Sequence, residues 1–213
     1  MADIKLICFD LDGTILNNNS WYELNLAFGM PIEEDQRLLG EYRLGRFSYE
    51  DWLQKILVFF QKSGKADFRT ITDILYQLST DYKEGVEEII NYLKSKNYRI
   101  ALISGSNDIL VNLVAKNLGI KFTRASNVFV FDENKNLEDI ITQGDDSQAK
   151  VKFLEDFCRK LDLMTDECAC IGDSQNDIGL FRKTGHGITF FGAEIEKEAW
   201  KVINKLSDLK EIL

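Results

Sequence analysis

The sequence has few proline, histidine and cysteine residues and no long apolar run. Its 213 residues include a single proline, Pro31, and a single histidine, His186. Four cysteines are present, but none forms a Cys-x-x-Cys pair, so a zinc site is a poor explanation for them. Buried small side chains are the simpler interpretation. No run approaches the ~20 apolar residues of a membrane-spanning helix.

Positive charge is also scarce. The chain carries 26 Lys and Arg residues against 35 Asp and Glu residues, which gives a formal net charge of −9. This balance argues against a nucleic-acid partner or an anionic membrane surface, because both require clustered basic residues. The first residues, "MADIKLICFD", lack the pattern of a secretory signal. We therefore expect a cytoplasmic protein, in which a phosphate-bearing ligand is attracted by local positive charge or by a metal ion.

The apolar pattern predicts an α/β fold. Strand-like runs at 4–10, 99–105, 167–173 and 186–191 alternate with segments of helical periodicity. Strands that are apolar on both faces and alternate with helices indicate a doubly wound, Rossmann-like parallel sheet covered on both sides. Two short runs around a polar turn at 128–142 predict a β-hairpin attached to that sheet.

Residues 19–80 interrupt this alternation with helical segments only. We expect helices near 20–29, 33–44, 48–62 and 67–79, with Ser48 and Asp51 as a capping pair for the third. The simplest interpretation is a small separate helical bundle with its own aromatic core. The predicted domains are a catalytic core at 1–16 and 82–213, and a helical cap at 17–81.

Polar residues follow the predicted strands at the edge where ligands bind in open parallel sheets. Asp10 and Asp12 follow the first strand, Ser104 and Gly105 end the second, and Asp173 and Asp177 follow the third; Lys150 lies in the first turn of a helix expected to begin near Ser147. Each feature alone is weak, because D-x-D-G is also a hairpin turn and a lone lysine is usually solvated. Their joint placement at one edge of a sheet carries the prediction.

A phosphate group and Mg²⁺ suit these side chains. The Ser104 hydroxyl, the backbone N–H groups near Gly105 and the Lys150 charge can hold an anion, while Asp10 and Asp173 are hard oxygen ligands for Mg²⁺. Asp10 is then the candidate nucleophile towards phosphorus. Asp12 is the candidate acid that protonates the leaving oxygen and later activates water.

The order of these motifs resembles the phosphatases of the haloacid dehalogenase superfamily. Their D-x-D-G-[TS] motif, strand-end Ser or Thr, Lys and G-D-x-x-x-D motif correspond to "DLDGT" (10–14), Ser104, Lys150 and "GDSQND" (172–177). The resemblance implies Asp10 as nucleophile and metal ligand, Asp12 as acid/base and backbone metal ligand, Asp173 as Mg²⁺ ligand, and Asp177 as support for the metal waters and Lys150. It also implies that Ser104, Gly105 and Lys150 hold the phosphate.

A helical insertion at this point resembles the cap of the phosphoserine phosphatase-like branch. The segments "GRFSYEDWLQK" (45–55) and "ISGSNDI" (103–109) are similar to segments of that branch. Its substrate-binding Glu and cap Arg correspond to Asn19 and Ile56 here, and Trp52 near Ile56 is apolar too. We therefore predict a small phosphorylated metabolite other than phosphoserine as the substrate. A phosphoserine phosphatase with a rearranged cap is the alternative.

Two further alternatives remain from the sequence alone. The first, of a different class, is a signalling module that is phosphorylated on aspartate, although such receiver domains are shorter and lack the insertion. The second is a mutase that returns the phosphate to its substrate. For either kind of enzyme the expected cofactor is Mg²⁺, with no nucleic-acid or membrane partner, and the expected state is a monomer or a homodimer.

Overall fold

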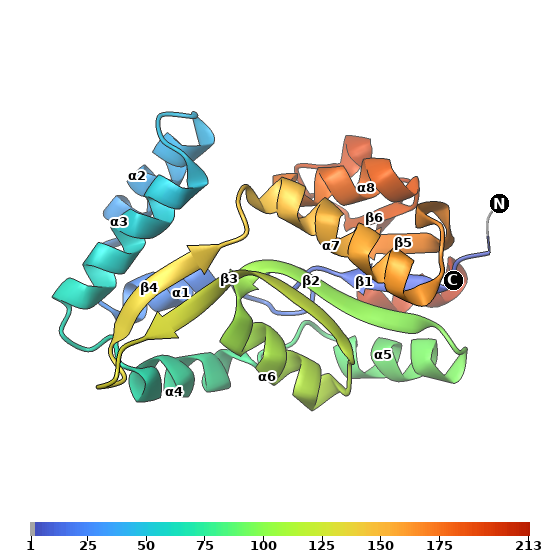
Figure 1. Ribbon diagram of the computed structural model, residues 1–213. Helices are drawn as coiled ribbons and strands as arrows, with labels where there is room; N and C mark the ends of the chain where they lie inside the picture. Colours follow the sequence, from blue (N-terminus) through green and yellow to red (C-terminus); the bar gives the residue numbers. More distant parts are fainter. Residues whose placement is uncertain (1–2) are drawn as a thin grey trace.

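The computed structural model describes residues 3–213 and centres on a seven-stranded sheet (Figure 1). The strand order is β4-β3-β2-β1-β5-β6-β7, and every neighbouring pair is parallel except β3 and β4. The strands are β1 (Leu6–Phe9), β2 (Arg99–Asn107), β3 (Phe122–Phe131), β4 (Leu137–Thr142), β5 (Cys168–Ile171), β6 (Gly187–Phe190) and β7 (Lys201–Ile203). The predicted α/β fold with a parallel sheet is confirmed.

Helices cover both faces of the sheet, because the central strands are apolar on both sides. The α-helices outside the insertion are α5 (Val86–Ser95), α6 (Asp108–Leu118), α7 (Asp146–Leu161) and α8 (Ile178–Thr184). Leu6 and Cys8 of β1 pack in a cluster with α7 and α8, whereas Ile7 and Phe9 belong to a second cluster with α5 and α6 (Figure 1). All four cysteines are buried and free, as small core side chains are expected to be.

The insertion after β1 forms four helices, α1 (Ser20–Ala27), α2 (Ile32–Arg43), α3 (Tyr49–Lys62) and α4 (Phe68–Leu78). The predicted pairing of Ser48 and Asp51 is confirmed as a capping box at the start of α3. The predicted all-helical insertion is confirmed, but its core is not separate from that of the sheet. Trp52 and Phe60 belong to the same hydrophobic cluster as Phe9, because α4 packs on α6 and α3 packs on β4. The domain boundaries themselves stay a prediction.

The hairpin is longer than the sequence predicts. β3 begins at Phe122, where it pairs in parallel with β2, and its second half pairs with β4 in antiparallel fashion. The segment 122–127 has no continuous apolar run, so only its pairing with β2 makes it a strand. The hairpin also touches the insertion, since Leu137 N donates to Ala66 O (2.7 Å) and Phe68 N donates to Lys135 O (2.8 Å).

Two short elements have no signal in the sequence. β7 contains only three residues and α8 only seven, and segments this short show no periodicity that distinguishes them from loops. Among the described residues, no helix is both long and apolar enough to cross a membrane.

Candidate active site

The carboxyl ends of β1, β2 and β5 bring the predicted residues together. Asp10 follows β1 directly, Ser104 lies near the end of β2, and Asp173 lies two residues beyond β5. Asp10 and Ser104 are buried, with 5% and 1% of their surfaces exposed. These strands are neighbours in the sheet, so residues far apart in the sequence share one edge.

Lys150 connects the two acidic motifs. It lies in the second turn of α7 and is completely buried, with 0% of its surface exposed. Its Nζ donates to Asp10 Oδ1 (2.9 Å), to Asp177 Oδ1 (2.8 Å) and to Asn176 Oδ1 (3.0 Å). All three ammonium hydrogens therefore have an acceptor, as a buried charge requires.

Lys150 and its neighbouring carboxylates shift one another's pKa values. Burial alone would lower the pKa of Lys150, but the negative charges of Asp10 and Asp177 outweigh burial and raise it. Burial raises the pKa of Asp10 well above its usual value, and Lys150 opposes this rise. Lys150 is thus held in its charged form beside a carboxylate that needs its positive charge.

Asp12 is held differently from Asp10. Ser20 Oγ, at the start of α1, donates to Asp12 Oδ2 (2.6 Å) and lies 2.7 Å from Ser106 Oγ. The other oxygen, Asp12 Oδ1, is buried and has no hydrogen-bond partner in the described part of the chain. Burial raises the pKa of Asp12 to about 6, although the Ser20 hydrogen bond lowers it. A carboxyl group with this pKa and a free oxygen is suited to exchanging protons near neutral pH.

The loop after β5 is ordered by Asp177. Its Oδ2 accepts from the backbone N–H groups of Asp173 (3.1 Å) and Ser174 (3.2 Å), while its Oδ1 accepts from Lys150. Asp173 in turn packs against the turn after β1: a Cβ on Gly13, where φ is +69°, would lie 2.2 Å from Asp173 Oδ2. Glycine is therefore required there both by conformation and by space.

The acidic side chains fit a divalent cation. Asp10, Asp173 and Asp177 each offer a carboxylate oxygen, and these oxygens lie within 4.8 Å of one another. Burial, followed by the charge of Asp177, raises the pKa of Asp173 to about 6. Carboxylate oxygens are the ligands that Mg²⁺ prefers, and a cation would remove their mutual repulsion. Because both oxygens of Asp177 already accept hydrogen bonds, Asp10 and Asp173 are the freer ligands.

Two of the three residues predicted to bind phosphate, Ser104 and Gly105, lie at a β-bulge of β2. Ser104 pairs with Ala125 and Asn107 pairs with Asn127, so two residues of β2 face one residue of β3. The bulge removes Gly105 and Ser106 from the ladder of backbone hydrogen bonds. Ser106 N donates to Ser104 Oγ (3.0 Å) instead. Backbone groups that leave the ladder at a strand end become available to a ligand.

Three side chains from other elements fix the Gly105 carbonyl. It accepts from Asn127 Nδ2 (2.7 Å), from Trp21 Nε1 (3.2 Å) and, at the limit of a hydrogen bond, from the Tyr49 hydroxyl (3.5 Å). Asp146 lies against the same residue, because a Cβ on Gly105 would be 2.1 Å from Asp146 Oδ2. The insertion, the hairpin and α7 thus all meet at the bulge.

A model of the haloacid dehalogenase-like hydrolase family matches residues 4–185. The chain belongs to this family. A phosphoserine phosphatase of Methanocaldococcus jannaschii is 31% identical over 214 residues, which cover 98% of this chain and 96% of that protein. A phosphoserine phosphatase of Campylobacter jejuni is 28% identical, over 99% of this chain and 98% of that protein. This haloacid dehalogenase-like hydrolase is therefore a phosphatase rather than a signalling module.

Solved structures agree with this assignment. One, a phospho-aspartyl intermediate analogue of phosphoserine phosphatase, superposes with a TM-score of 0.81 at 28% identity, covering 98% of this chain and 99% of that one. Another, a substrate-bound phosphoserine phosphatase complex, gives a TM-score of 0.80 at 28% identity, covering 100% and 98%. The predicted relation to the phosphoserine phosphatase-like branch is confirmed.

The three residues predicted to set specificity lie in different environments. Asn19 is exposed and caps α1, accepting from Tyr22 N (3.1 Å). Trp52 and Ile56 are buried in the hydrophobic core. Trp52 contacts the aromatic rings of Tyr49 and Trp21, which reach the Gly105 carbonyl. Of the three residues, Trp52 thus has a contact path to the bulge, and the specificity role of all three stays a prediction.

Several side chains of the site were not predicted. Asn176 lies within the quoted "GDSQND" motif, and Asp146 lies one turn before Lys150, so the sequence offered a signal for both. Ser106 likewise lies within the quoted "ISGSNDI" segment, whereas Ser20 and Asn127 carried no such signal, because their contacts depend on how α1 and β3 pack on the bulge.

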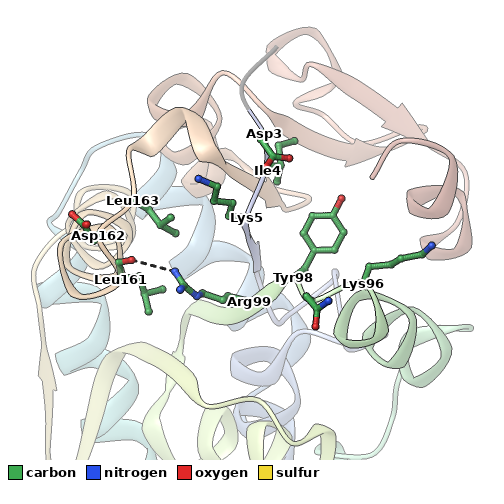
Figure 2. Close-up of a pocket in the computed structure, with 10 residues that line it drawn as sticks. Asp3, Ile4, Lys5, Lys96, Tyr98, Arg99, Leu161, Asp162 and Leu163 are labelled. Carbon is green, nitrogen blue, oxygen red and sulfur yellow. Dashed lines mark hydrogen bonds between the residues drawn. The ribbon is translucent and has the colours of Figure 1, made fainter.

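A groove of about 490 Å³ lies at the opposite end of the sheet, where β1 and β2 begin (Figure 2). Two of its three basic side chains have hydrogen-bond partners: Lys5 Nζ pairs with Glu167 (2.5 Å), and Arg99 Nη1 donates to Leu161 O (3.1 Å). Because the motif residues follow the strands rather than precede them, this groove is separate from the catalytic end.

Proposed function

We propose that this phosphatase is a Mg²⁺-dependent phosphomonoesterase that acts through a phosphorylated Asp10 on a small phosphorylated metabolite. The observation that carries the proposal is the buried Lys150, which joins the first acidic motif to the last. A solved relative described as a phospho-aspartyl intermediate analogue supports the covalent step. The bound Mg²⁺, with Asp10, Asp173 and the Asp12 backbone as its ligands, would neutralise negative charge on the phosphate.

The side chains can divide the reaction as follows. Ser104, the backbone N–H of Gly105 and Lys150 hold the phosphate, and Asp10 Oδ1 stays bound to Lys150. The other oxygen of Asp10 forms a bond to phosphorus while the bond to the leaving oxygen breaks, and Asp12 donates a proton to that oxygen. Asp12 then takes a proton from water, whose oxygen attacks phosphorus and releases inorganic phosphate and free Asp10. Positioning and charge neutralisation supply most of the catalysis in such transfers.

The leaving group that we propose is not serine. A serine carboxylate needs a cationic partner when it is buried, and Ile56 is apolar and completely buried. The cap's Arg43 and Arg46 are exposed, and Arg46 faces Glu41. Phosphoserine is the second candidate, because relatives that match almost the whole chain are named phosphoserine phosphatases. Neither the sequence nor the site favours a mutase over a phosphatase acting with water.

A panel of phosphate monoesters, assayed by phosphate release with and without Mg²⁺, tests the proposal. We expect release that depends on Mg²⁺ and disappears in Asp10→Asn, which keeps the shape of the side chain but removes the nucleophile. Asp73→Asn, on the exposed face of α4, is the matched control and should keep full activity. Asp10→Asn retaining a tenth of the wild-type rate would point to another nucleophile. If phosphoserine gives the highest kcat/KM, the second candidate is right.

A further inference from the structure

The active site contains more negative than positive charge. Five carboxylates gather there, those of Asp10, Asp12, Asp146, Asp173 and Asp177, and Lys150 is the buried cation among them. Even a bound divalent cation leaves an excess of negative formal charge, before the substrate brings its own phosphate. A second negative group on the substrate would add to this repulsion, whereas a positive group would reduce it.

Asp146 is the carboxylate that the proposed chemistry does not use. It is the first residue of α7 and only 7% of its surface is exposed. Ser126 Oγ donates to its Oδ1 (2.5 Å), and Asn176 Nδ2 donates to its Oδ2. No Lys or Arg among residues 3–213 lies within ion-pair distance of it. A buried carboxylate that forms no ion pair, although its charge raises the pKa of nearby Lys150, therefore lies directly against Gly105.

Aromatic side chains of the insertion lie over the same bulge. The rings of Tyr49 and Trp52 stack with centroids 5.7 Å apart, and the Tyr42 ring lies 5.6 Å from that of Tyr49. Tyr42 and Tyr49 are half-buried, so both keep part of their surface open. Burial raises the pKa of Tyr49, and the nearby charge of Asp146 raises it further. The Asp146 carboxylate thus lies close enough to Tyr42 and Tyr49 for its charge to raise the pKa of both phenols.

Asn127 adds a buried acceptor beside the Gly105 carbonyl. It is completely buried, and its Nδ2 donates both to the Gly105 carbonyl (2.7 Å) and to the Tyr49 hydroxyl (2.9 Å). Its Oδ1 has no hydrogen-bond partner within residues 3–213. A buried acceptor without a donor costs free energy unless a ligand or a water supplies one. An amide oxygen, a carboxylate and aromatic faces all attract a cation and offer nothing to an anion.

We infer that the leaving group carries a positive charge and no carboxylate: the substrate is the phosphate monoester of an amino alcohol, with a free or methylated ammonium group. This inference rests on the proposed function and specifies the substrate of that same site. The ammonium lies between the rings of Tyr42 and Tyr49 and the carboxylate of Asp146, while the phosphate lies at Ser104 and Lys150.

The decisive comparison uses two substrates of the same shape. Phosphocholine carries a trimethylammonium group, and 3,3-dimethylbutyl phosphate replaces its nitrogen with carbon and so lacks the charge. We expect kcat/KM for phosphocholine or phosphoethanolamine to exceed that for the neutral ester by at least about tenfold. Equal values for charged and neutral esters, or a higher value for phosphoserine, would overturn the inference. p-Nitrophenyl phosphate separates the two claims, because lack of Mg²⁺-dependent hydrolysis of any ester refutes the proposed function itself.

Single-residue variants test which side chains recognise the positive charge of the leaving group. Tyr49→Leu removes the ring and should bring the ratio of charged to neutral kcat/KM towards one, whereas Tyr49→Phe should preserve it. Asp146→Asn should also lower the ratio. The controls are Tyr76→Leu, an exposed aromatic of α4, and Asp156→Asn, a charge removed farther along α7; both should keep the wild-type ratio. A ratio that is unchanged in Tyr49→Leu and in Asp146→Asn contradicts the inference.

A measurement on the wild-type enzyme does not depend on how the variants fold. Choline should inhibit p-nitrophenyl phosphate hydrolysis competitively, and 3,3-dimethylbutanol should inhibit at least about tenfold more weakly. Equal inhibition by the two alcohols would show that shape, and not charge, is recognised.

Discussion

Removal of the Lys150 charge tests how the site is held together. Lys150→Met keeps an apolar stem of similar length but deletes the ammonium that contacts Asp10, Asn176 and Asp177. Lys150 and Asp177 are completely buried and Asp10 is 5% exposed, so water cannot solvate the two carboxylates once the ammonium is gone. The variant therefore leaves two buried carboxylates without their cation.

The expected loss of stability is large. Breaking a buried ion pair by removing one partner costs about 3–5 kcal/mol, because the remaining charge is uncompensated. In a chain of 150–250 residues, 1 kcal/mol corresponds to roughly 2–4 °C in Tm, so Tm should fall by about 6–20 °C. This is a substantial part of the ~5–15 kcal/mol that stabilises a typical domain.

The loss should depend on pH in a defined direction. Burial raises the pKa of Asp10 above its unfolded value of about 3.9, and Lys150 opposes that rise, so the variant should raise it further. Between the unfolded and folded pKa values the native state binds more protons than the unfolded state, so stability falls as pH rises. The difference from wild type should thus be smallest near pH 4 and largest at neutral pH.

Urea unfolding of wild type and variant in EDTA, at several pH values, measures this difference. Lys152→Met is the matched control, because Lys152 is exposed on the same helix and should change stability by less than about 0.5 kcal/mol. A loss below about 1 kcal/mol for Lys150→Met at neutral pH, or a loss that grows as pH falls, would refute this account of the buried charges.

Three further outcomes are expected. Chelation with EDTA should abolish phosphate release, and added Mg²⁺ should raise Tm because it binds the folded state; unchanged values of both would remove the metal from the site. Asp12→Asn should lower turnover ~100-fold or more; with p-nitrophenyl phosphate, whose leaving group needs no proton, phosphorylated Asp10 should accumulate, which intact-mass spectra would show as an added phosphate. Gly105→Ala should lower kcat/KM by about 100-fold, because its Cβ would lie 2.1 Å from Asp146 Oδ2, whereas Gly40→Ala, with no atom within 4 Å, should not.

The sequence predicted the parts of the molecule whose signals are local. The run around Leu6–Phe9 is apolar on both faces, so a buried parallel strand was the simplest solution, and Asp10 had to lie at its carboxyl end. The capping pair of Ser48 and Asp51 is likewise a local signal, because the two residues lie within a segment of four. Such features need no knowledge of the tertiary structure.

Features that depend on packing could not be predicted. The bulge between Ser104 and Asn107 exists only relative to β3, whose first half has no strand pattern of its own. The shared core of insertion and sheet was missed for a similar reason, because the helical periodicity of α3 shows which residues are buried but not that β4 covers them.

In the proposed mechanism, the bulge connects substrate recognition with catalysis. The Gly105 carbonyl accepts hydrogen bonds from Trp21 and Tyr49 of the insertion and from Asn127 of the hairpin, so the backbone that we propose binds phosphate is positioned by residues that we propose lie beside the leaving group. Ser20, at the start of the insertion, binds Asp12 in the same way. A leaving group that displaces Tyr49 therefore also changes the restraint on Gly105, and the choice of substrate becomes inseparable from the placement of the phosphate.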